Sequence, residues 1–233
     1  DLRPTVLEGP KLVDAGESVS AKWTVVNDGD GTARASWTDR LYLSSDDSYG
    51  GNDAYLGDVE HGVPLASQGT YEAELKFTVP NVAPGSYYLI VKVDHYSRVF
   101  ESSETNQFRA IPIQVRVPDL VPASLSATGV AEVGQSMVAT WTVANRGDGA
   151  AQPSWTDRLY LSTDTEYDSK DIALGDVAHA TVLAAGASYQ AELKFTVPNV
   201  TSGVYYLIVQ ADRYNRVFES IETNNFLARV LGD

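Results

Sequence analysis

The sequence contains no cysteine among its 233 residues, and its only histidines are His61, His95 and His179. Without cysteine, neither a disulfide framework nor a thiolate metal site can form. Gly-x-Ser-x-Gly, P-loop and His-Glu-x-x-His patterns are also absent. His61 and His179 lie in polar segments, where we expect them to be solvated. These absences indicate a non-enzymatic protein.

Basic charge is scarce, because 17 Lys and Arg residues stand against 31 Asp and Glu residues, a net charge of −14. Such a surface repels nucleic-acid phosphates and anionic membranes, so we expect no nucleic-acid partner. No apolar run approaches the ~20 residues that a membrane helix needs, so we expect no membrane insertion. The chain opens on Asp1, without a signal peptide, and we expect it to be a piece of a longer chain whose neighbouring domains are partners.

What the sequence does contain is an internal duplication. The segment Trp37–Ser44 returns letter for letter as Trp155–Ser162, and a shift of 118 positions (155 − 37) aligns the halves without a gap. We therefore predict two domains, 1–118 and 119–233. The join around Pro118 has no Gly/Ser-rich spacer, so we expect a short, stiff connection and an end-to-end rod.

Alternation of apolar and polar residues predicts strands throughout each copy. It is clearest over 71–79, which reads Tyr-Glu-Ala-Glu-Leu-Lys-Phe-Thr-Val. No segment has a sustained helical period, and turn residues recur at regular spacing. We predict an all-β protein made of two tandem immunoglobulin-like antiparallel β-sandwich domains. We also expect a polar loop over 45–58 and a last strand of the first copy from about Val99 to Val117.

Short motifs recur in the same order in both copies. In the first copy these are Asn-x-Gly-x-Gly at 27–31, Tyr-Leu-Ser-x-Asp at 42–46, Pro-Gly-x-Tyr at 84–87, and Val-Asp at 93–94 followed by Glu-x-x-Glu-x-Asn at 101–106. Their order resembles the CARDB family, the cell-adhesion-related domain found in bacteria. The resemblance covers both copies almost completely, although the second has Ser202 where the first has Pro84 and Ala211 where the first has Val93. It implies an immunoglobulin-like fold in an exported bacterial protein, such as a multi-repeat adhesin or an appendage to a secreted enzyme.

Tyr87 and its equivalent, Tyr205, stand two residues after a glycine and two before a leucine. The spacing is similar to the tyrosine corner of antibody domains, with leucine in place of the cysteine. The alternative is a core tyrosine at a strand start.

Acidic residues gather in the polar loop of each copy. A hard cation such as calcium takes six to eight oxygens from a flexible loop, and alternate carboxylates can supply several of them. The alternative is an Asp-rich turn whose side chains cap backbone amides. The predicted calcium ligands are Asp164, Glu166, Asp168 and Asp171 in the second copy, with Asp46 and Asp53 in the first.

Asp39 is an unusual residue on the Trp/Leu face of its strand. We expect a buried carboxylate that is hydrogen-bonded to a neighbouring turn, in preference to a second metal site.

The sequence favours an extracellular bacterial module, secreted or on the cell surface, that acts as a calcium-stabilised spacer or adhesion segment of a larger protein. Its adhesion target would be a protein or a carbohydrate. The alternative is a carbohydrate-binding accessory domain of a secreted enzyme, in which tyrosines stack on sugar rings; the candidates are Tyr49, Tyr55, Tyr88 and Tyr96. An exposed aromatic patch on one face would favour that alternative, and an evenly polar surface would favour a spacer.

Overall fold

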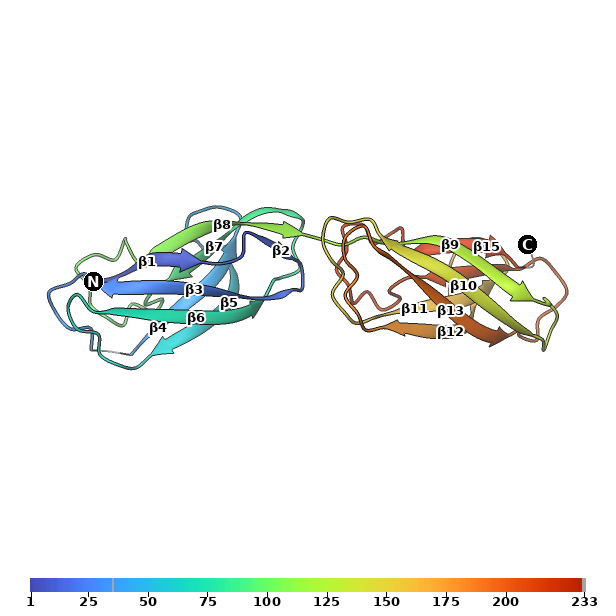
Figure 1. Ribbon diagram of the computed structural model, residues 1–233, viewed down its shortest axis with the longest axis horizontal. Helices are drawn as coiled ribbons and strands as arrows, with labels where there is room; N and C mark the ends of the chain where they lie inside the picture. Colours follow the sequence, from blue (N-terminus) through green and yellow to red (C-terminus); the bar gives the residue numbers. More distant parts are fainter. Residues whose placement is uncertain (35, 232–233) are drawn as a thin grey trace. The chain divides into compact units, whose positions relative to one another are not determined.

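The computed structural model describes residues 1–34 and 36–231, and we treat its two units separately (Figure 1). The chain divides into Asp1–Val115 and Arg116–Asp233, called here the first and second domains. All regular elements of the described residues are β-strands. Within this part of the chain there is accordingly no helix long and apolar enough to span a membrane.

The first domain consists of two antiparallel sheets. One has the order β1-β3-β6 and the other the order β2-β8-β7-β4-β5, so the chain changes sheet three times after β3. The strands are β1 (Leu2–Glu8), β2 (Leu12–Asp14), β3 (Ser18–Asn27), β4 (Trp37–Ser44), β5 (Ala54–His61), β6 (Thr70–Thr78), β7 (Gly85–Lys92) and β8 (Phe108–Arg116).

Apart from β2, the second domain repeats this topology, with sheets ordered β13-β10-β9 and β12-β11-β14-β15. The expected all-β architecture of tandem immunoglobulin-like sandwiches is confirmed. Its strands are β9 (Leu120–Gly129), β10 (Ser136–Asn145), β11 (Trp155–Ser162), β12 (Ile172–His179), β13 (Ser188–Thr196), β14 (Tyr206–Gln210) and β15 (Phe226–Val230).

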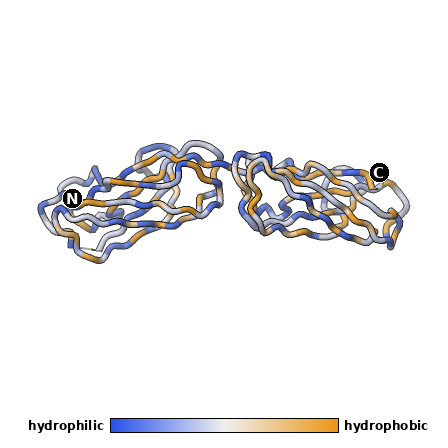
Figure 2. Tube along the Cα trace, in the orientation of Figure 1, coloured by the Kyte–Doolittle hydropathy of each residue, from blue (hydrophilic) through white to orange (hydrophobic). Residues whose placement is uncertain are grey.

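The core of each sandwich lies between its two sheets. Along β10, Met137, Ala139, Trp141 and Val143 are all buried, and the residues between them are only partly buried. Hydrophobic and hydrophilic positions therefore alternate along the strands in Figure 2. This period of two is what places a tryptophan at the centre of each core.

The Asn-x-Gly-x-Gly motif closes the turn after β10 around a buried asparagine. The Asn145 amide donates to the carbonyls of Gly149 (2.8 Å) and Leu183 (3.0 Å), and its oxygen accepts from the amides of Gly147 (3.1 Å) and Asp119 (3.0 Å). A Cβ at Gly147 would lie 2.4 Å from a backbone oxygen, so only glycine fits there. The motif joins the start of the domain to the end of β10.

The tyrosine-corner spacing corresponds to real hydrogen bonds. The hydroxyl of Tyr87 donates to the carbonyl of Ala83 (3.0 Å), and that of Tyr205 donates to the carbonyl of Thr201 (3.0 Å). A tyrosine corner forms the same bond to backbone a few residues upstream.

Two sequence-based boundaries need correction. The polar loop of the first domain ends before Ala54, because Gly57 and Asp58 pair with Leu41 and Arg40 inside β5. The last strand begins at Phe108, not at Val99, because the segment between them is held by side chains and not by a ladder. At β5, polar residues suggest a loop, and before β8, alternation suggests a strand. In both places tertiary contacts override the local pattern.

Candidate functional site

The acidic loop of the second domain closes on its own backbone. Asp164 accepts a hydrogen bond from the amide of Glu166 (2.9 Å), and Asp168 accepts one from the amide of Lys170 (2.7 Å). Asp171 accepts from the amide of Asp168 (2.9 Å). These are short-range side-chain caps of the kind that hold Asp-rich turns.

The acidic loop of the first domain has the same construction. Asp46 accepts from the amide of Ser48 (2.9 Å), and Asp53 accepts from the amide of Gly50 (2.8 Å). Among the described residues, no three or more His, Asp or Glu side chains are grouped so that they could hold a metal ion. The six predicted calcium ligands are therefore not preassembled into the oxygen-rich shell that calcium requires.

An aromatic side chain docks each acidic loop on the outer face of its sheet. In the second domain, the ring of Tyr167 lies 4.7 Å from Tyr160 on β11 and stacks on Phe226 of β15 at 5.1 Å. Ile208, opposite Tyr160 in the sheet, is fully buried although it faces away from the core. The loop thus covers a small second hydrophobic cluster, and this packing is what positions it.

In the first domain, the ring of Tyr49 docks in the same way, 5.4 Å from Tyr42 and 6.5 Å from Phe108. Nδ1 of His95 lies 3.0 Å from the hydroxyl of Tyr42 and 3.3 Å from that of Tyr49. Nε2 of His95 faces the guanidinium of Arg40 at 3.0 Å. Since a guanidinium can only donate, Nε2 accepts, and His95 is neutral with its proton on Nδ1.

The most extensive buried polar network surrounds Asp39, whose side chain is fully buried in the first domain. Its Oδ2 accepts hydrogen bonds from Nε1 of Trp23 (2.7 Å) and the hydroxyl of Tyr71 (2.7 Å), and lies 3.1 Å from Nε2 of His61. Nε1 of Trp37 in turn donates to the Tyr71 hydroxyl (3.1 Å). Burial, followed by the neighbouring Asp39 charge, raises the pKa of Tyr71 far above its usual range.

The second domain repeats the bonds to Oδ2 of this network with the equivalent residues. Oδ2 of Asp157 accepts from Trp141 (2.8 Å) and Tyr189 (2.7 Å) and lies 3.0 Å from Nε2 of His179. Oδ1 of Asp157 accepts from the amide of Asp212 in the turn after β14 (3.3 Å). The burial expected for Asp39 is confirmed, and its hydrogen bonds join it to the opposite sheet and to β5; the expected bond to a neighbouring turn is made by its equivalent, Asp157.

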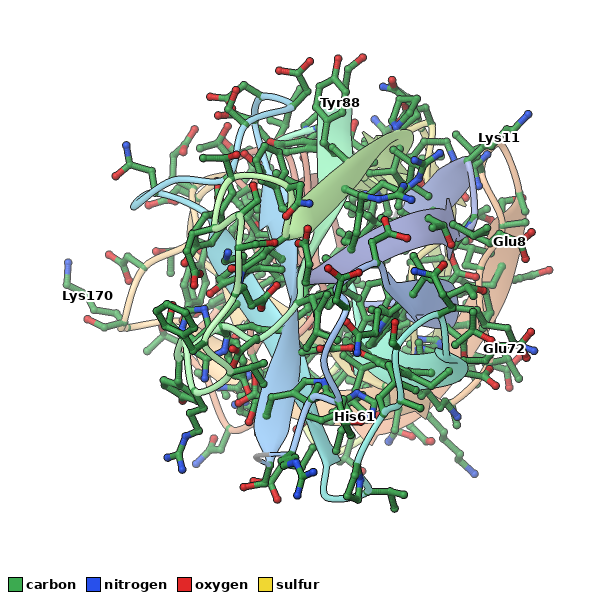
Figure 3. The ribbon with its side chains drawn as sticks, turned by 90° about the vertical axis from the view of Figure 1, so that its left-hand side faces the viewer. Glu8, Lys11, His61, Glu72, Tyr88 and Lys170 are labelled. Atoms are coloured by element: carbon green, nitrogen blue, oxygen red, sulfur yellow. The ribbon has the colours of Figure 1, made fainter. Side chains whose placement is uncertain are left out.

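The expectation that His61 and His179 are solvated is wrong. Their side chains are only 15% and 13% exposed. The ring of His61 lies 4.2 Å from Tyr71 and stacks on Trp37 at 5.6 Å. Figure 3 labels His61 on the first domain, where Glu72, by contrast, projects at the periphery. These histidines belong to the buried network and are not free to act on a ligand.

A second buried carboxylate fastens the start of each domain. Oε2 of Glu101 accepts from the amide of Leu2 (2.6 Å), and its Oε1 accepts from the side-chain amide of Gln107 (2.6 Å). Glu219 accepts in the same way from the amide of Leu120 (2.5 Å). Burial raises the pKa of Glu101, and it raises the pKa of Glu219 to about 8. The closing Glu-x-x-Glu-x-Asn motif is thus a structural anchor.

The outer face of the first domain also carries an exposed cationic–aromatic cluster. Arg40 is held by two bonds to Asp58 (2.6 and 2.8 Å) and by one to the hydroxyl of Tyr96 (2.7 Å). Its guanidinium lies 4.8 Å from the ring of Tyr55 and 5.2 Å from that of Tyr96. Both rings are more than half exposed, at 58% and 52%. This cluster therefore combines exposed aromatic rings with a fixed ion pair, a set of side chains with ligand-binding chemistry.

A model of the CARDB family matches residues 1–110 and 117–229, one region in each domain. The chain belongs to the CARDB family. CARDB domains are non-catalytic modules, which agrees with buried carboxylates and histidines that are engaged in structural bonds.

Three solved structures of single CARDB-like domains are similar to half of this chain. The CARDB domain of the PF1109 protein from Pyrococcus furiosus, described in complex with di-metal ions, is 19% identical over 49% of this chain and 92% of that one, with a TM-score of 0.39. Its solution structure is 20% identical over 49% and 94%, with a TM-score of 0.38. A domain of a candidate cell surface protein from Methanosarcina acetivorans is 29% identical over 49% and 90%, with a TM-score of 0.38. No curated protein sequence matches the chain.

Replacing Tyr189 by Phe tests the buried network. The change removes a hydroxyl that donates to Asp157 and accepts from Trp155, so the free energy of unfolding of the second domain should fall by about 1–3 kcal/mol. Urea unfolding measures the loss. Tyr214→Phe is the matched control, because the ring of Tyr214 is 53% exposed. Equal stability of the two variants would contradict a structural role for the network.

Proposed function

We propose that this CARDB pair is a non-enzymatic, extracellular spacer or adhesion segment of a larger bacterial protein. Family membership supports a modular role, and the net charge of −14 suits a surface that stays soluble and avoids nucleic acid. The observation that carries the proposal is the path of the chain through each domain, which begins at one end of the sandwich and leaves at the other.

In the first domain, two side chains hold Asp1. Its amino group donates to the Asn27 side chain (3.1 Å), and its carboxylate accepts from the Asn106 side chain (3.1 Å). β8 starts next to that end and runs away from it, until Val115 lies opposite Gly85. Nine residues of strand span roughly 30 Å at ~3.3 Å per residue. A domain with termini at opposite ends adds its whole length to the chain that contains it.

The second domain is threaded in the same way. Asp119 is held by Asn145 (3.0 Å) and Asn224 (2.9 Å) at the end where the chain enters. β15 leaves in the opposite direction, with Val230 paired to Tyr206. The duplication therefore repeats a unit whose geometry favours extension.

Surface display tests the spacer proposal. Two chains can be displayed on bacteria that bear a thick polysaccharide layer, one with an epitope after a single domain and one with the epitope after both domains. Antibody binding to the epitope is then measured for each. We expect binding to increase with the number of domains, because each adds length between the epitope and the cell. Equal binding at matched expression would contradict the proposal.

Calcium stabilisation is a separate hypothesis, supported by the exposed carboxylates of the acidic loops. Calcium bound to the folded state must raise the melting temperature relative to EDTA. The double variant Asp168→Asn with Asp171→Asn should remove the increase attributable to the second loop. The single variant Asp47→Asn, at an acidic residue outside the predicted ligands, is the control and should preserve the increase. A melting temperature that is identical in calcium and EDTA would show that the loops only cap turns.

Carbohydrate binding is the second candidate, and the Arg40 cluster is the observation that favours it. Tyr55 and Tyr96 present exposed rings beside a fixed ion pair, a combination that can stack on a sugar and bond its hydroxyls. Tyr49 is largely occupied by docking its loop, and Tyr88 is partly buried. The cluster is specific to the first domain, because Ala173 occupies the position of Tyr55 in the second.

Calorimetric titration with a panel of soluble polysaccharides tests this candidate. If one binds, Tyr55→Ala should weaken it by about tenfold, the value of a lost aromatic contact. Tyr214→Ala, which removes an exposed tyrosine beside Arg213 in the second domain, should leave the affinity unchanged. An equal loss of affinity in both variants would argue against a sugar site at Arg40. The absence of binding by the wild-type chain to every polysaccharide in the panel would also argue against it.

A further inference from the structure

A lysine and a glutamine meet beside two carboxylates in the first domain. Lys92 ends β7, and its Nζ contacts Oε1 of Gln107, the residue just before β8. The amide of Val93 donates to the carbonyl of Gln107 (2.8 Å), which fixes the two backbones next to each other. The Gln107 side chain is fully buried, so its amide group has little freedom to turn away.

The side-chain nitrogen of Gln107 faces the acids. Nε2 lies 2.6 Å from Oε1 of Glu101 and 2.8 Å from Oε2 of Glu104. Glu101 is itself fixed by the amide of Leu2. A lysine amine therefore lies on one side of a buried carboxamide, and a carboxyl group that can exchange protons lies at the nitrogen that would have to leave.

We propose that the first domain forms an intramolecular isopeptide bond between Nζ of Lys92 and Cδ of Gln107. The neutral amine attacks Cδ, forming a C–N bond and moving the carbonyl π-electron pair onto Oε1. The acid form of Glu101 gives its proton to Nε2 and then takes one from Nζ. When the electron pair returns, the Cδ–Nε2 bond breaks and ammonia leaves. Glu101 ends as it began, and no further reactant is consumed.

The protonation states that this step needs are those that burial favours. Burial lowers the pKa of Lys92, although nearby Glu104 and Glu101 oppose the shift, which increases the neutral amine. Burial also raises the pKa of Glu101, which increases the acid form. The docked ring of Tyr49 lies 5.9 Å from Nζ and helps to cover the amine. An amine and an acid that are both neutral are the reactive pair.

The second domain supplies a built-in control. It retains the equivalents of both acids, Glu219 and Glu222, and has an amide at Asn225. The position of Lys92 is occupied by Gln210, which is not a nucleophile. Only the first domain can therefore form the bond.

Intact-mass spectrometry of the purified full chain tests the proposal. The folded protein should be lighter than its sequence by one ammonia, and trypsin should release peptide 77–98, uncut at Lys92, joined to peptide 99–109. Lys92→Arg and Glu101→Gln should each have the full sequence mass. Glu219→Gln, the matching change in the second domain, should keep the loss of ammonia.

The full sequence mass for the folded wild-type chain would overturn the proposal. It would also be overturned by a loss of ammonia without the joined 77–98 and 99–109 peptides, since succinimide formation at an asparagine gives the same mass. A cross-link that persists in Glu101→Gln would exclude Glu101 from the proton transfers assigned to it. The melting curve of each variant shows whether its domain is folded.

Discussion

The structure of each domain depends on one buried carboxylate that connects its two sheets. Asp39 lies on β4, and two of its partners, Trp23 and Tyr71, come from β3 and β6 of the opposite sheet. An isolated buried carboxylate is costly, and three donors aimed at one oxygen offset that cost. Antibody domains join their sheets with a disulfide, which a chain without cysteine cannot do. Here the inter-sheet connection is a charge-assisted hydrogen-bond network, and it constrains the sheets only while every donor keeps its place.

The acidic loops show that one residue pattern can serve two different purposes. Alternate carboxylates can surround a cation or cap backbone amides, because both uses require only an oxygen acceptor in a tight turn. The tyrosine between the carboxylates is the residue that bears on which of these two uses applies. Tyr167 fixes its loop by packing on Phe226, which is 59 residues away in the sequence (226 − 167). Aromatic packing thus positions the loop, and calcium binding by its carboxylates stays a prediction.

The sequence predicted what short-range periodicity controls and missed what long-range polar contacts control. The bounds of β4 follow from its alternation and its exact repetition, and the sandwich class follows from many such strands. The start of β5 was missed because Gly57 and Asp58 resemble a turn, while Asp58 is in fact paired with Arg40 across the ladder. His61 was assigned to solvent because nothing near it in sequence reveals Asp39 as its partner. Buried polar residues resemble exposed ones in a single sequence, and only the fold distinguishes them.

The two copies show which parts of the molecule are free to carry specific chemistry. The carboxylate network and the Glu anchors recur with nearly the same distances, so they are the scaffold. On the outer face of the larger sheet, Tyr55, Lys92 and His95 of the first domain become Ala173, Gln210 and Arg213 in the second. None of these changes touches the Asp39 or Asp157 network, so the face can vary without loss of the fold. The sugar site and the covalent cross-link proposed for the first domain each depend on a residue of this face, Tyr55 or Lys92, that the second domain lacks.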